Sequence, residues 1–296
     1  MAKIIAIANQ KGGVGKTTTA VNLSACLAAA ERRTLLLDLD PQGNASTALG
    51  LDKENFAKLN VYHALIGEES IENCLYRTEL PGLDICPSDN NLIGAEIELV
   101  SAFSRESKLK VALQPIMDKY DYIIIDCAPS LNLLAVNALN AANSFLVPMQ
   151  TEFLAMEGLT QLLNTVRLIR ASLNPNLELE GILLTMYDSR NNLSKLVAQD
   201  LMNHFKDDIM KSIIPRNVKL SECPSHGKPI ILYDIASKGS EAYLSLAKEV
   251  ILKTEGMGKA PVNLPIELPE EKEVKTPPLP PRIPSFDDYE IKPGSH

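Results

Sequence analysis

A glycine-rich stretch near the start of the chain has the residue types of a phosphate-binding loop. It reads NQKGGVGKTT from Asn9 to Thr18 and lies between an apolar run and a helical pattern. Glycines at this spacing let backbone N–H groups converge on phosphate oxygens, and the start of the next helix adds a favourable positive field. The residues expected to contact a nucleotide are Gly12, Gly13, Val14, Gly15, Lys16, Thr17 and Thr18.

This loop contains two lysines, whereas the common motif G-x-x-x-x-G-K-[ST] needs only one. Lys16 occupies the position whose side chain reaches the β- and γ-phosphates, and the Thr17 hydroxyl is the expected Mg²⁺ ligand. Lys11 lies where the motif asks for no cation. The core phosphate contacts therefore do not need Lys11, so its positive charge can have a separate role.

Two further loops place an aspartate after an apolar run. LLLDLDPQGN contains Asp40, and YIIIDCAPS contains Asp126. An acid at the end of a strand beside the phosphate loop is the usual water-mediated ligand of Mg²⁺, and Asp126 fits this role. Asp40 could orient or deprotonate the water that attacks the terminal phosphate. The alternative role for either residue is a helix cap or a turn.

The motifs lie within alternating strand and helix patterns. The predicted strands are Lys3–Ala8, Thr34–Leu39, Leu83–Cys86, Tyr122–Asp126, Phe145–Met149, Leu179–Met186 and Ser212–Pro215. The predicted helices are Thr17–Ala30, Leu131–Ala142, Ala155–Leu173, Leu193–Phe205 and Glu241–Lys253. Strands this apolar are buried on both faces, so we predict an α/β fold with a doubly wound, mostly parallel sheet and helices on both faces. Ligands bind such sheets beyond the carboxyl ends of the strands, where the three motifs lie.

Composition narrows the class of protein. The 296 residues are 45% hydrophobic, enough for a large core, and the five cysteines are scattered without a CxxC pair. This pattern argues against a disulfide framework or a zinc site. The sequence shows no leader-like segment and no apolar run long enough to span a bilayer, so we expect a cytoplasmic protein that does not bind membrane.

Charge is distributed unevenly along the chain. The net charge of −8 argues against a uniformly basic surface for nucleic acid. Residues 187–239 nevertheless carry eight Lys/Arg against six Asp/Glu. A local anion-binding surface and an ordinary solvated surface are both compatible with this segment.

The amino-acid composition changes after Lys253, where proline and acidic residues become frequent. Such a composition cannot bury enough apolar surface to offset the entropy of ordering. We therefore expect residues 1–254 to form one folded domain and residues 255–296 to form a Pro-rich, acidic, disordered tail. Within that tail, TPPLPPR and PSFDDYE could dock a partner protein or serve only as a spacer.

Together these motifs resemble those of the deviant Walker A ATPases. The matching stretches are KGGVGKTT, DLDPQGN and IIDCAPS. More closely, the chain resembles the chromosomal ParA/Soj partition ATPases in TMYDSR, IIPRNVKLSECPSHGKPI and SKGSEAYLSLAKEV. The resemblance runs almost continuously from Met1 to about Lys253. It implies a P-loop fold and a slow, Mg²⁺-dependent ATPase that is monomeric when empty or ADP-bound and dimeric with ATP.

The resemblance also implies roles for individual residues. Lys11 would reach across the dimer to the phosphates bound by the other subunit, so Lys11, Lys16 and Asp40 would be the catalytic residues. Pro215 and Asn217 would lie against the adenine. The residues that match the family's nonspecific DNA contacts are Arg190, Arg216 and Lys219.

By resemblance, the partners are the nucleoid and a ParB-like protein that stimulates hydrolysis. MinD proteins bind membrane through a basic amphipathic C-terminal helix, which this acidic C-terminal segment does not match. Iron-protein and Mrp relatives need paired cysteines, whereas Cys127 has no second ligand nearby in sequence. Two alternatives remain open. One is a positioner of another cargo recruited through the tail, and the other is a metabolic ATP-dependent enzyme of the same superfamily.

Overall fold

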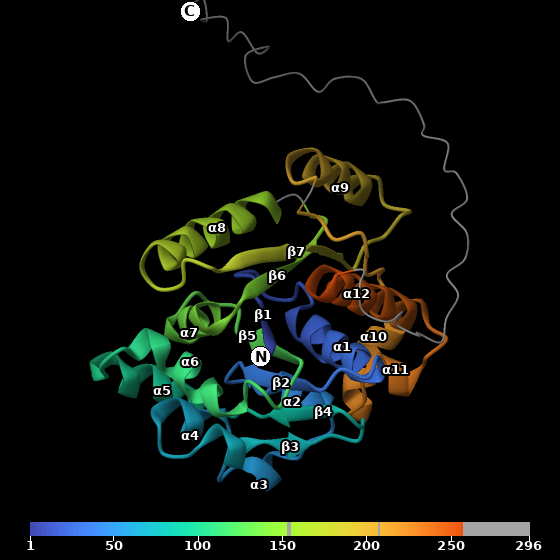
Figure 1. Ribbon diagram of the computed structural model, residues 1–296. Coiled ribbons are helices and arrows are strands. Elements are labelled where there is room, and N and C mark those ends of the chain that lie inside the picture. The colour runs from blue at the N-terminus through green and yellow to red at the C-terminus, as the bar shows by residue number, and fades with distance from the viewer. Residues whose placement is uncertain (153–154, 207, 257–296) are drawn as a thin grey trace, which may run out of the picture. The chain divides into compact units, whose positions relative to one another are not determined.

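The computed structural model describes residues 1–152, 155–206 and 208–256, which belong to one compact unit. Its centre is a seven-stranded sheet with the order β3-β4-β2-β5-β1-β6-β7 (Figure 1). The strands are β1 (Lys3–Ile7), β2 (Thr34–Leu39), β3 (Tyr76–Arg77), β4 (Leu83–Cys86), β5 (Tyr122–Cys127), β6 (Ser144–Gln150) and β7 (Glu178–Thr185). Neighbouring strands are parallel except for β3 and β4, which are antiparallel.

Helices cover both faces of this sheet. They are α1 (Lys16–Ala29), α2 (Asn44–Ala48), α3 (Lys53–Phe56), α4 (Val61–Ile66), α5 (Leu92–Glu98), α6 (Lys108–Leu113), α7 (Leu133–Ala141), α8 (Ala155–Ser172), α9 (Asn192–His204), α10 (Val218–Glu222), α11 (Ile230–Tyr233) and α12 (Lys238–Glu255). Short 3-10 helices are η1 (Ile71–Cys74), η2 (Leu99–Ser101), η3 (Arg105–Ser107), η4 (Gln114–Ile116) and η5 (Cys223–His226). Figure 1 shows α1 and α10–α12 on one side of the sheet and α4–α7 on the other. The predicted doubly wound fold is confirmed, and the five predicted helices correspond to α1, α7, α8, α9 and α12.

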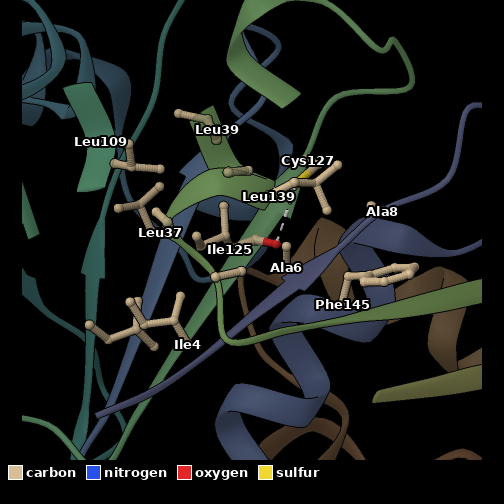
Figure 2. Close-up of a cluster of buried hydrophobic side chains, with 14 of the residues drawn as sticks. Ile4, Ala6, Ala8, Leu37, Leu39, Leu109, Ile125, Cys127, Leu139 and Phe145 are labelled. Atoms are coloured by element: carbon tan, nitrogen blue, oxygen red, sulfur yellow. Dashed lines mark hydrogen bonds between the residues drawn. The ribbon is translucent and has the colours of Figure 1, made fainter. Parts of the chain in front are cut away.

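Alternate residues of the central strands pack against different layers. In the cluster of Figure 2, Leu37 of β2 and Ile125 of β5 lie with Leu139 of α7 in one buried hydrophobic core. Side chains alternate across a strand, so the residues that follow, Asp38 and Asp126, face the opposite layer, which contains α1. These two aspartates are register partners on neighbouring strands. The sheet thus places two carboxylates side by side next to the start of α1.

The strand predicted at Ser212–Pro215 is wrong. This segment forms no regular strand: it makes an isolated bridge between Tyr187 and Pro215, and the Ile214 N–H donates to the Leu184 carbonyl at 2.9 Å. The Glu249 carboxylate of α12 accepts hydrogen bonds from the backbone N–H groups of Lys211 and Ser212, at 2.8 and 3.0 Å, and from the Ser212 hydroxyl at 2.9 Å. These donors are therefore not available for a regular β-ladder.

The C-terminal end of α12 is fixed near the amino ends of the strands. Arg32, which precedes β2, donates two hydrogen bonds to the Glu255 carboxylate at 2.8 and 3.0 Å. Within the described ranges, no helix has both the length and the apolar content needed to cross a bilayer. The predicted tail lies almost wholly outside the described residues, so the tail and its boundary with the folded domain stay predictions.

Candidate nucleotide site

The glycine-rich loop joins the carboxyl end of β1 to the first turn of α1. Gly13 and Gly15 have φ angles of +73° and +87°, which favour glycine. A Cβ atom built on Gly12 or Gly13 would meet nothing within 4 Å. The loop backbone therefore borders open space at the start of a helix, where an anion binds favourably.

Three side chains from neighbouring strand ends fix this loop. The Thr185 hydroxyl donates to the Val14 carbonyl at 2.8 Å, and the Gln150 amide donates to the Gly13 carbonyl at 3.0 Å. Asn9 accepts a hydrogen bond from the Lys11 backbone N–H at 3.0 Å. Because these loop groups are satisfied by the protein, the loop is held in shape without a ligand.

Lys16 is held across the loop and is 7% exposed. Its ammonium group donates to the Lys11 carbonyl at 3.0 Å. Burial lowers the pKa of Lys16, while the nearby charges of Asp126, Cys127 and Asp40 act in the opposite direction. An ammonium group has three donors, so donors remain for phosphate oxygens.

Asp126 is fully buried at the end of β5, beside α1. Burial and the neighbouring Asp38 charge raise the pKa of Asp126 well above its usual range, and the opposing effects of Thr17 and Lys16 are smaller. Neither carboxylate oxygen receives a well-formed hydrogen bond from the residues that the structure describes. Such a buried carboxylate is costly unless a cation or its bound water satisfies it. Thr17 and Asp126 therefore fit Mg²⁺: the hydroxyl would ligate the ion, and the carboxylate would bind its water.

Asp38 anchors the loop that carries Asp40. Its carboxylate accepts from the Ser46 backbone N–H and hydroxyl, at 2.9 and 2.7 Å, and from the Asp40 N–H at 3.2 Å. Burial raises the pKa of Asp38 to about 6 against the effect of these hydrogen bonds. Asp40 itself is 8% exposed and accepts from the Gln42 N–H at 2.9 Å. This loop thus fixes Asp40 close enough to Lys16 for its charge to influence the lysine.

A substitution at Gly43 tests whether ATP hydrolysis depends on the conformation of the loop that carries Asp40. Its φ angle is +64°, and an added Cβ would approach the Ser88 carbonyl oxygen to 2.5 Å. We expect Gly43→Ala to slow ATP hydrolysis and to destabilise the fold by more than the ~1–2 kcal/mol that the backbone conformation alone costs. ATP binding should persist, because the phosphate loop is a separate segment. Thermal unfolding and phosphate release measure the two effects.

Gly67→Ala is the matched control, because Gly67 also has a positive φ angle of +84° but open space around its Cβ. Gly67→Ala should lose only the folding stability that the backbone conformation costs, and it should hydrolyse ATP normally. If the two variants behaved alike, contact with Ser88 would not be what positions Asp40.

Pro215 and Asn217, which the resemblance places against the adenine, lie beside the start of α1. Together with Gly15, Thr18 and Tyr243 they line a cavity of about 90 Å³. The Asn217 side-chain oxygen already caps α10, because it accepts from the Lys219 N–H at 2.8 Å. The cavity adjoins the phosphate loop, and contact of Pro215 and Asn217 with an adenine stays a prediction.

The Lys11 side chain makes a contact of its own, although the Lys11 carbonyl accepts from Lys16. Its ammonium group forms an ion pair with Glu152, which follows β6, and both side chains are about half exposed. Lys11 therefore has an acidic partner in its own chain, and its reach toward a second subunit stays a prediction.

The three predicted DNA contacts come from two adjacent segments. Arg190 lies in the loop after β7, and the Arg216 backbone N–H donates to the Tyr187 carbonyl of that loop at 3.0 Å. Arg190 and Arg216 both lower the pKa of Asp188, the hydrogen bond from Arg190 most strongly. Lys219 follows in the first turn of α10. The structure brings the three cations into one region, but it does not test DNA binding.

Comparisons with known proteins agree with these features. A family model described as an AAA domain matches residues 2–179. The chain is 55% identical over 249 residues to the chromosome partitioning protein ParA of Myxococcus xanthus (strain DK1622), covering 84% of this chain and 88% of that protein. It is 55% identical over 250 residues to the sporulation initiation inhibitor protein Soj of Bacillus subtilis (strain 168), covering 84% and 98% respectively. This chain belongs to the ParA/Soj family.

A solved structure gives a further point of comparison for this ParA/Soj chain. It is cobyrinic acid a,c-diamide synthase from Mycobacterium smegmatis with bound ADP and magnesium. The match has a TM-score of 0.77 and 36% identity, and covers 88% of this chain and 98% of that one. The family resemblance and the fold predicted from the motifs are both confirmed.

Several residues that shape the site in this ParA/Soj chain were missed in the sequence analysis. Thr185 and Gln150 hold the phosphate loop, and Glu152 pairs with Lys11. Asp38, which the sequence places with Asp40 at the end of the second strand, anchors the Asp40 loop. Each lies at or just beyond the carboxyl end of a strand. That position is the signal that could have found them, since all such ends meet at one edge of a parallel sheet.

Proposed function

We propose that this chain is an Mg²⁺-dependent ATPase that dimerises with ATP, binds DNA without sequence preference and works with a ParB-like protein in chromosome or plasmid partition. The observation that carries the proposal is the convergence of Lys16, Asp126 and Asp40 beside an open phosphate loop. The names of the ParA and Soj relatives support a role in partition. ADP and magnesium in the Mycobacterium smegmatis relative support ATP and Mg²⁺ as ligands here.

The proposed chemistry follows from the geometry of the site. Backbone N–H groups of the loop and the Lys16 ammonium group bind the phosphates, and Thr17 and Asp126 hold the cation. Mg²⁺ supplies positive charge that stabilises the phosphoryl group in transfer. Asp40 orients a water molecule, whose oxygen forms a bond to the γ-phosphorus while the bond to the ADP oxygen breaks. Lys11 of the second subunit adds a cation, which makes hydrolysis depend on dimerisation.

We further propose that the ATP-bound dimer binds the nucleoid through Arg190, Arg216 and Lys219, and that the protein is therefore cytoplasmic and nucleoid-associated. A dimer doubles the number of phosphate contacts, and such contacts release counterions, so affinity should fall steeply with salt. The ParB-like partner would reset the dimer by stimulating hydrolysis. A partner that docks on residues 257–296 stays a prediction, because those residues lie outside the described structure.

Charge reversal at Arg190 tests the DNA surface. Arg190→Glu should weaken DNA binding of the ATP-loaded protein by roughly 10-fold or more on every sequence alike, because a phosphate contact is replaced by repulsion. Fluorescence anisotropy with several unrelated duplexes over a salt series measures this. Lys110→Glu, on α6, is the control for the change in net charge and should have little effect. Equal binding without nucleotide, or a strong preference for one duplex, would contradict the proposal.

A metabolic ATP-dependent enzyme is the second candidate, because the relative from Mycobacterium smegmatis carries an enzyme name. Such an enzyme would couple ATP hydrolysis to a small substrate and would not need DNA. ATP turnover measured with DNA and with cobyrinic acid in parallel separates the two candidates. Stimulation by the small molecule alone would favour the enzyme.

A further inference from the structure

Two of the three predicted DNA-contacting cations already have an acidic partner in their own chain. Arg190 donates through Nε and Nη2 to the two oxygens of Asp188, at 2.9 Å each, and its backbone N–H donates to the same carboxylate at 3.0 Å. The Lys219 ammonium group lies 2.9 Å from a Glu222 oxygen. The same Glu222 oxygen accepts from the Tyr233 hydroxyl at 2.9 Å.

These carboxylates stay charged under ordinary conditions. The hydrogen bonds from Arg190 lower the pKa of Asp188 to about 2. Lys219 and then Tyr233 lower the pKa of Glu222. The cations are nonetheless accessible, since the Arg190 side chain is 87% exposed. The predicted DNA surface therefore carries fixed negative charge directly beside its cations.

A carboxylate and a phosphate compete for the same donors on these side chains. Asp188 binds the guanidinium group in the two-bonded geometry that arginine also uses for phosphate, so Arg190 cannot make both complete interactions at once. A DNA phosphate that approaches either cation also meets the repulsion of the adjacent acid, which is strongest at low salt. Exposed ion pairs are weak, so phosphates can displace these acids when enough contacts form together.

We propose that Asp188 and Glu222 set the DNA affinity of this protein by competing with phosphates for Arg190 and Lys219. The inference rests on the proposed function. With both acids present, Arg190 and Lys219 are each paired with a carboxylate, so firm DNA binding needs the two surfaces of an ATP-bound dimer. The acids thus keep the ADP-bound monomer off the nucleoid.

Neutral isosteres test this competition. Asp188→Asn keeps an acceptor for the Arg190 backbone N–H, and Glu222→Gln keeps one for Tyr233, so each removes mainly charge. We expect each variant to bind random duplex DNA roughly 3- to 10-fold more tightly with ATP at low salt. The double variant should also bind measurably without nucleotide. The assay is fluorescence anisotropy with the full chain, after thermal unfolding and ATP binding have been compared with the unmodified protein.

Asp121→Asn is the matched control. Asp121 accepts from the Arg33 backbone N–H and from two guanidinium nitrogens, at 2.9, 3.3 and 3.2 Å, but lies at the amino end of β5. It reproduces the pairing pattern and the charge change away from the predicted surface, so its DNA affinity should stay close to that of the unmodified protein. A gain as large as that of Asp188→Asn would reduce the effect to net charge and overturn the proposal.

If Asp188 instead orients Arg190 for DNA, Asp188→Asn should weaken DNA binding, which is the opposite of what competition predicts. In an Arg190→Gln background, competition predicts that Asp188→Asn gains much less than it does beside arginine. Unchanged or weaker DNA binding by both isosteres, while Arg190→Glu still weakens DNA binding, would overturn this inference and leave the proposed function intact. If the unmodified protein bound no DNA with ATP, the proposed DNA binding would fail, and the inference with it.

Discussion

Asp40→Ala should still bind Mg-ATP and dimerise but should hydrolyse ATP about 10²- to 10⁴-fold more slowly, the usual contribution of a positioned general base. The phosphate loop and Lys16 are separate from Asp40 in the chain and keep their own hydrogen bonds. The loss should therefore appear in the chemical step alone. Single-turnover phosphate release measures that step, and a fluorescent nucleotide measures binding.

Asp52→Ala is a suitable control, because Asp52 is an exposed aspartate that precedes α3 in the same part of the chain. Its hydrolysis should match that of the unmodified protein. Rapid turnover by Asp40→Ala would remove Asp40 from the mechanism, and loss of nucleotide binding would make it a binding residue instead.

Lys11→Ala should retain ATP binding while losing ATP-dependent dimerisation. Each γ-phosphate would then lack the cation from the other subunit, and partner-stimulated hydrolysis should fall by roughly 10³-fold or more, as when an arginine finger is removed. Within its own chain Lys11 contacts Glu152, an exposed pair whose loss changes folding stability by at most about 1 kcal/mol. Analytical ultracentrifugation with and without ATP measures the dimer.

Mixing two defective proteins tests whether Lys11 acts in trans. Lys11→Ala subunits can bind ATP, and Lys16→Ala subunits, which should not bind it, still carry Lys11. Partial recovery of hydrolysis in the mixture would support action across the dimer. A Lys11→Ala protein that dimerises with ATP as tightly as the unmodified chain would show that Lys11 is not the clamp.

The sequence was sufficient to predict the parts of the site that depend on local patterns. The phosphate loop lies where a strand signal meets a helix signal, Asp40 follows β2, and Asp126 lies at the end of β5. The positions of these three motifs then follow from the parallel sheet, because the carboxyl ends of its strands share one edge. The structure places the backbone of all three as expected.

Long-range partners could not be predicted in this way. Lys11 and Glu152 are 141 residues apart, and no local pattern links them. The strand predicted at Ser212–Pro215 had suitable residues, but the Ser212 backbone N–H at its start donates to Glu249 of the distant helix α12. In that segment a tertiary contact overrode the local preference for a strand.

The position of Glu255 has a consequence for how cargo could be attached. Glu255 is tied to Arg32 and lies beside Tyr122, at the amino ends of β2 and β5, whereas the phosphate loop follows the carboxyl end of β1. The sheet therefore separates the point where the polypeptide continues toward residue 257 from the edge that handles nucleotide. If a second subunit and DNA bind at the phosphate-loop edge, as proposed, they would leave the edge that carries Glu255 uncovered.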